Sequence, residues 1–257
     1  MRRPLRRPAA ILTIAFTLLQ PLPVAADGTI SLHWQDCTTT AINRNAESGP
    51  IDRIVVTLKG ASGPIKGLQV QIRLSPGFAV LPPAWRFDPA GCEAGHFAAR
   101  ATASAPGCPI LLGGRVTTLS GFDYGAEIER GRAYYYAAFD PFVADPATIY
   151  TLVQFEFDHT NAISGFGTGP AACGCLDRPL CVALTSASYL DGSDIEIPFA
   201  VAQEYLSWND PNNSLACPGY WCELGTCPPP PIDSTCVVQA PTPANARSWG
   251  SVKATYR

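Results

Sequence analysis

The chain has 257 residues, of which 47% are hydrophobic and only 15% are charged. It is long enough to bury a substantial core, and its 22 glycines and 25 prolines favour short strands and tight turns over long helices. The formal net charge of −3 argues against a nucleic acid as partner, because phosphate binding requires a basic surface.

Residues 1–26 predict the compartment. Four arginines precede an apolar run from Ala9 to Leu19, and Val24-Ala25-Ala26 supplies the small residues of a cleavage site, which is the pattern of a secretory signal peptide. The apolar run is shorter than the roughly 20 residues of a membrane span, so it is not expected to be a membrane anchor. No transmembrane segment is expected after its removal. We expect a secreted protein, extracellular or on the cell surface. Without the four arginines, 14 basic and 21 acidic residues leave a net charge near −7.

The clearest strand candidate follows Gly67. Its apolar positions are Leu68, Val70, Ile72 and Leu74, and the polar positions between them are Gln69, Gln71 and Arg73. This alternation is the period of a strand with one buried face. A register shift of one residue would bury the glutamines and the arginine, so the register is strongly fixed.

Further strand candidates recur along the chain with turn residues between them. They cover Ile30–Trp34, Ile54–Leu58, Phe97–Ser104, Val116–Leu119, Ala133–Phe139, Tyr150–Asp158, Cys181–Leu190 and Ile195–Val201. No segment before Trp208 has helical periodicity. We therefore predict an all-β domain over residues 27–208, an antiparallel two-sheet β-sandwich with Val153, Phe155 and Phe157 in its core.

Proline interrupts this pattern after the strand that follows Gly67. Pro76-Gly77 ends that strand, and Pro82-Pro83 predicts extended backbone without a helix before Trp85. Trp85 and Phe87 are then expected to enter an apolar environment.

Two of these segments resemble cohesin modules. GLQVQIRLSP at residues 67–76 resembles the cohesin strand that runs into a short turn with proline, and TIYTLVQFEF at residues 148–157 is similar to a later cohesin strand. The resemblance covers residues 28–207 and implies a cohesin-like or immunoglobulin-like sandwich with a binding or scaffolding role. Ser75 stands where cohesins usually have aspartate, so dockerin binding is not implied. The motifs WQDC, LPPAW and CGC also resemble secreted bacterial proteins without an assigned activity.

The ten cysteines predict disulfide bonds, because their number is even and the chain is exported. Six lie in the predicted sandwich and four lie after it: Cys37, Cys92, Cys108, Cys173, Cys175 and Cys181, then Cys217, Cys222, Cys227 and Cys236. Each group could be closed within itself, for example by a bond between Cys92 and Cys108, although spacing does not decide the connectivity. The spacings do not match those of structural zinc sites, so no metal is expected.

Catalytic motifs are missing from the sequence. It contains no nucleophile elbow, zinc-protease motif, phosphate loop or dinucleotide fingerprint. The three histidines, His33, His96 and His159, fit a polar strand face or loop edges. Glu156 and Asp158 point the same way from one strand, about 7 Å apart, as in an inverting glycosidase, although solvated acids explain them more simply. We expect no enzyme, with a glycan-active hydrolase as the second alternative.

Aromatic residues supply the candidate binding surface, which consists of Tyr134, Tyr135, Tyr136 and Trp85. Consecutive tyrosines place two phenol rings on one sheet face and one on the other, where they either contact a partner or cover the core. The partner is expected to be an extracellular protein or a glycan. An exposed cluster of Tyr, Trp and Asp would indicate a carbohydrate-binding module, and a flat apolar patch with a polar rim would indicate a protein partner.

The segment DGSDIE at residues 191–196 has two interpretations. Its oxygens could bind calcium, but it lacks the remaining positions of a calcium loop, and a hairpin turn explains it more simply. No cofactor is therefore expected.

The composition changes after Trp208. Residues 209–246 form a Cys/Pro-rich tail that disulfides can staple. In residues 247–257, Ser248 is a candidate N-cap, and Trp249, Val252 and Tyr256 fall on one face of a short amphipathic helix with a basic opposite face. This helix is too short to be stable alone, so we expect it to dock on its own domain or on an export or cell-surface partner.

Overall fold

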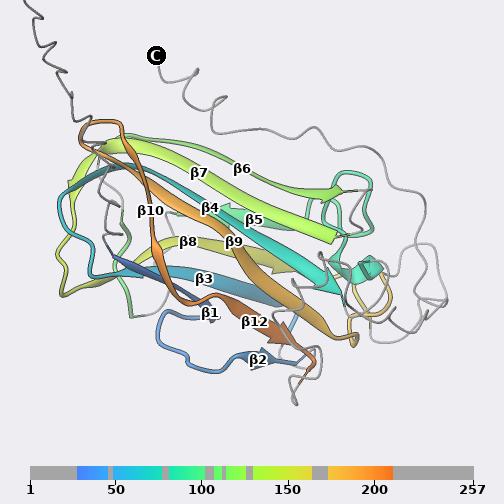
Figure 1. Ribbon diagram of the computed structural model, residues 1–257. Coiled ribbons are helices and arrows are strands. Elements are labelled where there is room, and N and C mark those ends of the chain that lie inside the picture. The colour runs from blue at the N-terminus through green and yellow to red at the C-terminus, as the bar shows by residue number, and fades with distance from the viewer. Residues whose placement is uncertain are drawn as a thin grey trace, which may run out of the picture.

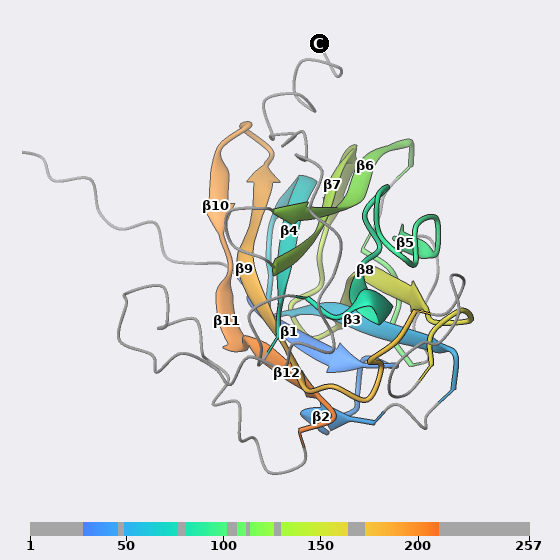
Figure 2. The ribbon, with the colours of Figure 1, turned by 90° about the vertical axis from the view of Figure 1, so that its right-hand side faces the viewer.

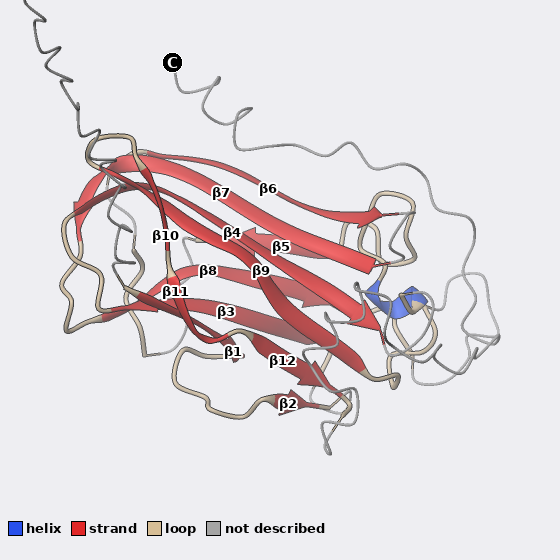
Figure 3. Ribbon diagram, viewed as in Figure 1, coloured by secondary structure: helices blue, strands red, loops and turns tan. Residues whose placement is uncertain are grey.

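The computed structural model describes residues 28–45, 49–76, 81–101, 107–111, 114–125, 130–163 and 173–210, which form a β-sandwich (Figure 1, Figure 3). The predicted signal peptide, almost all of the Cys/Pro-rich tail and the predicted C-terminal helix lie outside these residues. The strands are β1 (Thr29–Trp34), β2 (Asn43–Arg44), β3 (Ile51–Lys59), β4 (Pro64–Pro76), β5 (Phe97–Arg100), β6 (Val116–Gly125), β7 (Arg130–Val143), β8 (Ile149–Asp158), β9 (Leu180–Asp191), β10 (Glu196–Pro198), β11 (Ala200–Gln203) and β12 (Tyr205–Trp208).

The strands form two sheets that pack face to face (Figure 2). The five-stranded sheet has the order β11-β1-β3-β8-β5, and the seven-stranded sheet has the order β2-β12-β9-β4-β7-β6, with β10 paired to β9. The prediction of two sheets is confirmed, but the sheets are mixed, because β11 pairs with β1 and β2 pairs with β12 in parallel. Since β2 and β11 are reached from strands of the opposite sheet, no hairpin fixes their direction.

The strand predicted after Gly67 lies within β4, between β7 and β9, and is antiparallel to both. Its inward side chains are fully buried, and its polar side chains between them are partly exposed. The predicted alternation and core positions are confirmed, as they are for Val153, Phe155 and Phe157 in β8. Burying each of these side chains stabilises the fold by about 1.5–3 kcal/mol.

The other predicted strands are present with shifted ends. β6 continues to Gly125 instead of ending at Leu119, while β5 ends at Arg100 instead of Ser104. The segment predicted over Ile195–Val201 contains two strands, β10 on the large sheet and β11 on the small sheet. Their separation at Phe199 allows the chain to cross from one sheet to the other.

Trp85 lies at the centre of the aromatic core. Its ring contacts those of Phe87, Phe157, His159 and Trp208, with centroid distances between 4.6 and 6.3 Å. The expectation that no helix precedes Trp85 is wrong at one point, because Pro83–Trp85 form a single 3-10 turn. Pro82 has the predicted extended backbone, and Pro83 begins the turn, where its missing N–H breaks no hydrogen bond.

Two disulfide bonds connect distant parts of the described chain, Cys37–Cys108 and Cys92–Cys173. The pairing of Cys92 with Cys108 is therefore wrong. Cys175 and Cys181 are disulfide-bonded as well, so none of the six cysteines in the described ranges is a free thiol. No helix in the same ranges is long and apolar enough to span a membrane.

Candidate functional site

The aromatic residues proposed as a binding surface are buried. Tyr135 points into the core, and Trp85 is completely enclosed. Tyr134 and Tyr136 point to the opposite side of β7, on the outer face of the large sheet, but only 7% and 3% of their surfaces are exposed. Because none of the four presents a free ring face, the expected aromatic platform is not formed by these residues.

Tyr134 and Tyr136 pack against neighbouring strands, which explains their burial. The phenol oxygen of Tyr134 covers Gly121 of β6 so closely that not even a β-carbon would fit there. Leu119 packs against the pair. Gln71 of β4 donates a hydrogen bond to the hydroxyl of Tyr136 at 2.8 Å. Burial raises the pKa of Tyr136, so the hydroxyl is neutral at physiological pH.

Polar side chains surround this small apolar centre. Gln69 donates to the hydroxyl of Ser186 on β9 at 2.9 Å, and Arg132 pairs with Asp123 across β6 and β7 at 2.7 Å. We define the outer face of β9, β4, β7 and β6 as the outer platform. It combines a small apolar centre with ordered amides and charges, which is the composition of a polar protein-binding surface.

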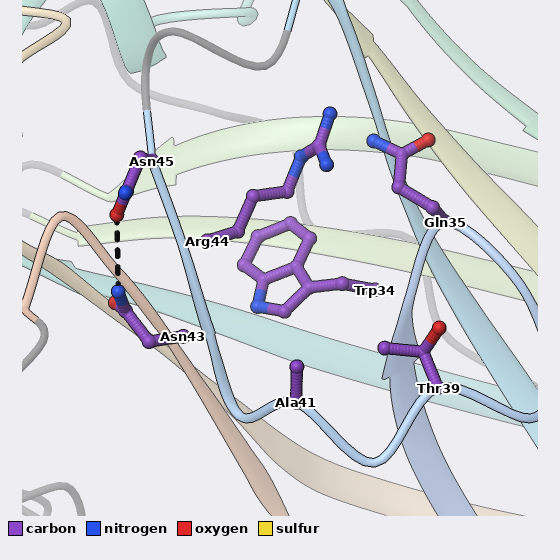
Figure 4. Close-up of a pocket in the computed structure, with 7 residues that line it drawn as sticks. All are labelled: Trp34, Gln35, Thr39, Ala41, Asn43, Arg44 and Asn45. Atoms are coloured by element: carbon purple, nitrogen blue, oxygen red, sulfur yellow. Dashed lines mark hydrogen bonds between the residues drawn. The ribbon is translucent and has the colours of Figure 1, made fainter.

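A pocket opens where the chain after β1 returns along β12 (Figure 4). Its volume is about 330 Å³, and it is lined by Trp34, Gln35, Thr39, Ala41, Asn43, Arg44 and Asn45. Arg44 and Gln35 extend toward the same end of the pocket, and Asn43 donates to Asn45 at 3.1 Å (Figure 4). The polar lining consists mainly of amide and guanidinium groups, which suit a polar, uncharged or anionic ligand.

A buried carboxylate is linked to one end of this pocket. Asp52 of β3 is completely enclosed, and its Oδ1 accepts hydrogen bonds from Arg44 and, at 3.3 Å, from Gln35. Its Oδ2 has no hydrogen-bond donor among the described residues. Burial raises the pKa of Asp52 to about 6, although Arg44 and Arg53 lower it in part.

His159 lies beside Asp52 in the core. Its Nε2 is 3.8 Å from Oδ2 of Asp52, and its ring packs against Trp85, Phe87 and Trp208. Burial lowers the pKa of His159 to about 4, so the imidazole is neutral above that pH. His159 follows β8 directly, at the edge of a loop as expected, but its side chain is buried.

The remaining acid and histidine candidates are engaged in the structure. Glu156 is held between Arg53 and Arg100, with N–O distances of 3.2 and 3.3 Å. The hydrogen bond from the Thr160 hydroxyl lowers the pKa of Asp158, whereas a glycosidase acid needs a raised one. Asp158 therefore does not fit the role of the acid in the hydrolase alternative.

His33 and His96 have structural partners. His33 bridges the Thr39 carbonyl and the Thr57 hydroxyl, at 2.8 and 3.0 Å, and so holds the segment after β1 against β3. His96 contacts Asp158 and Asn161 next to the Cys92–Cys173 disulfide.

Residues 191–196 form the turn between β9 and β10. Oδ1 of Asp191 accepts the amide hydrogens of Ser193 and Ile195, Asp194 pairs with Lys66, and Glu196 accepts from Ser188. This agrees with the hairpin interpretation. Within the described ranges, no group of three or more His, Cys, Asp or Glu side chains is arranged to hold a metal ion.

The sequence analysis did not predict the Asp52–His159 pair, although it could have predicted the burial of Asp52. Asp52 has the same parity in its strand as Ile54, Val56 and Leu58, so the period of two already places it on the inward face. An acid at such a position requires a partner. The identity of that partner depends on tertiary contacts, because Arg44 and His159 are brought to it by other segments.

Comparisons with known proteins concern the fold. No protein-family description matches the chain, and no curated protein is similar to it in sequence. Its structure is similar to a cohesin module of a Clostridium perfringens family 33 glycoside hydrolase, with 11% identity, a TM-score of 0.37, and coverage of 72% of this chain and 98% of that one.

Two type II cohesins show the same degree of similarity. The Acetivibrio cellulolyticus cellulosome cohesin has 12% identity and a TM-score of 0.37, with coverage of 71% of this chain and 95% of that one. Cohesin A11 of Bacteroides cellulosolvens has 11% identity and a TM-score of 0.33, with coverage of 70% and 98%. At these TM-scores no residue role is transferred from the cohesins to this chain.

Proposed function

We propose that the protein is a non-catalytic binding module that uses the outer platform to bind another protein outside the cell. The observation that carries this proposal is the ordered array of Gln69, Gln71, Tyr136, Arg132 and Asp123 on one broad sheet face. Their hydrogen bonds within the sheet fix the side chains before a partner arrives, which reduces the entropy lost on binding.

The composition of the outer platform supports a protein partner over a glycan. Sugar-binding surfaces rely on exposed ring faces, but Tyr134 and Tyr136 are covered. A small apolar centre with amides and an ion pair around it resembles the polar surfaces of non-obligate protein complexes. The disulfide-bonded state of all six described cysteines supports an oxidising, extracellular location. Two of the similar cohesin structures are complexes with dockerin modules, but the proposal does not rest on them.

Carbohydrate binding is the second candidate, and the pocket beside Trp34 favours it. Gln35, Asn43, Arg44 and Asn45 supply several donors and acceptors of the kind that recognise sugar hydroxyls. The two candidates use different places on the molecule and can be separated by mutation.

The test immobilises the oxidised mature protein for a glycan array and for capture from the secreted proteins of its own source. The platform variant is Gln69→Glu/Gln71→Glu, which keeps side-chain size and allows Ser186 and Tyr136 to donate to the new carboxylates. Lys59→Glu is the control, because it changes the net charge equally at an exposed position of the other sheet.

We expect one protein to be captured by the wild type and by the Lys59→Glu control, and to be lost with the platform variant. Glycan binding that survives the platform change but is lost on Arg44→Ala would replace the protein proposal with the carbohydrate one. Turnover of a glycan would reject both binding proposals.

A further inference from the structure

The edges of the two sheets differ in length. Three edge strands are short: β2 has two residues, and β5 and β11 have four each. The fourth, β6, has ten residues and lies at the border of the large sheet beyond β7 (Figure 1). An edge strand presents every second backbone N–H and C=O away from its sheet, so β6 offers a long row of such groups.

The β6 edge lacks the features that normally prevent sheets from joining. Natural edges are blunted by lysine, proline, bulges or short length. Between Val116 and Gly125 there is no lysine, arginine or proline, and all ten residues pair with β7 without a register shift. Thr117, Thr118 and Ser120 are exposed. This edge is therefore suited to adding another strand.

Among the described residues, only β7 pairs with the backbone of the first eight residues of β6. The strand pairs with β7 on one side. On the other side, residues Val116 to Asp123 make no backbone hydrogen bond to any described residue. Within the described part of the chain, their outward amide and carbonyl groups are therefore open to an additional strand, which would gain directional hydrogen bonds along most of its length.

We propose that a second copy of this chain adds to the edge, so that two β6 strands pair antiparallel about a two-fold axis at Leu119. The sequence around Leu119 is self-complementary in this register. Arg115 then lies opposite Asp123 of the other copy at both ends of the interface. The pairs between these ends are Val116 with Phe122, Thr117 with Gly121, and Thr118 with Ser120 of the other copy.

This register is favoured over its neighbours by charge. Moving the axis to Ser120 places Arg115 opposite Gly125, and moving it to Thr118 places Asp123 opposite Gly113. In both cases the ionic pair is lost at both ends. Opposite charges across antiparallel strands are stabilising, as are hydroxyl pairs and contacts between aromatic and β-branched residues. The dimer joins two large sheets edge to edge and leaves the outer platforms of both copies on the same side. It goes beyond the proposed binding function by making the module bivalent.

The test exchanges the charges at the two ends of the interface. In the Arg115→Asp protein, both ends of a homodimer bring two acids together, and in the Asp123→Arg protein both ends bring two arginines together. A mixed dimer of the two variants has opposite charges at both ends. Lys59→Asp is the matched control, with the same charge change as Arg115→Asp on the other sheet.

Sedimentation of the full oxidised protein over a concentration series measures the dimer dissociation constant. We expect each variant alone to dimerise about tenfold more weakly than wild type, and their mixture to recover to within about threefold. The Lys59→Asp control should match wild type. If Asp123→Arg fails to fold, the comparison of Arg115→Asp with the Lys59→Asp control still tests whether dimerisation depends on the charge at position 115. A wild type that stays monomeric up to about 1 mM, or a dimer insensitive to Arg115→Asp, would overturn the proposal.

Discussion

Asp52 and His159 lie next to each other in the core and affect the pH dependence of stability in opposite directions. The folded pKa of Asp52 is raised from 3.8 to about 6, so its favourable contribution to stability is complete below pH 3.8 and is lost as the pH rises through 6. The folded pKa of His159 is lowered from 6.5 to about 4, so its contribution is complete above pH 6.5 and is lost as the pH falls toward 4. Between pH 4 and 6 the two slopes oppose each other.

Removing either group should expose the slope of the other. We expect Asp52→Asn to lose up to about 3 kcal/mol more stability than wild type on acidification from pH 6.5 to 4, because only the histidine dependence remains. His159→Gln should show the reverse trend, with stability falling as the pH rises from 4 to 6. Urea unfolding at a series of pH values measures both. Asp194→Asn, at an exposed position, serves as the control, and parallel pH profiles for all three variants would disprove the compensation.

The burial of some residues could be predicted from the sequence, and that of others could not. The inward positions of β4 and β8 were predictable, because strict alternation has one physical solution in a sandwich. The burial of Tyr134 and Tyr136 was not, since it depends on Gly121 and Gln71 from neighbouring strands. Local pattern fixes the face on which a side chain lies, whereas contacts across strands decide whether that face is covered.

At the scale of elements, the two disulfides connect segments that lie outside the strands. Cys37–Cys108 fastens the segment after β1, and Cys92–Cys173 fastens the loop before β5 to the segment before β9. Both close long loops, with separations of 71 and 81 residues. Long loops gain most from a cross-link, because the unfolded chain loses more freedom.

We expect the Cys92→Ala/Cys173→Ala protein to be less stable than wild type by about 4 kcal/mol, from the entropy of an 81-residue loop. Urea unfolding under oxidising conditions measures the difference. Cys37→Ala/Cys108→Ala should lose a similar amount, because its loop is nearly as long. A loss below about 1 kcal/mol in both variants would show that the sheets already hold these segments in place.

The strands that sequence reasoning missed are short or polar. β2 has two residues and β12 has four, which is too few for a periodic pattern. The second half of β6 contains Gly121 and Asp123, which normally argue against a strand. Both positions are tolerated because they lie on the outer platform, where Gly121 makes room for Tyr134 and Asp123 pairs with Arg132. Tertiary contacts therefore overrode local propensity at these places.

At the scale of the whole molecule, β12 closes the described sandwich. It pairs with β9 and β2, and Trp208 at its end packs against Trp34 and Trp85 and donates to the Leu176 carbonyl at 2.7 Å. The strands that form both sheets thus lie between Thr29 and Trp208, and each finds its neighbours within that range.

Deleting residues 247–257 should therefore leave the sandwich folded. We expect the melting temperature to change by less than about 2 °C, because the deletion removes no cysteine and no strand of the two sheets. Trp208→Ala in the full chain is the contrasting variant, and its loss of a large buried ring should cost about 3–5 kcal/mol and lower the melting temperature by about 10 °C. Calorimetry of the oxidised proteins compares them. A deletion that lowers the melting temperature as much as Trp208→Ala would show that the segment packs on its own domain. A deletion that changes only the location of the protein would support a partner that binds the basic, aromatic terminus.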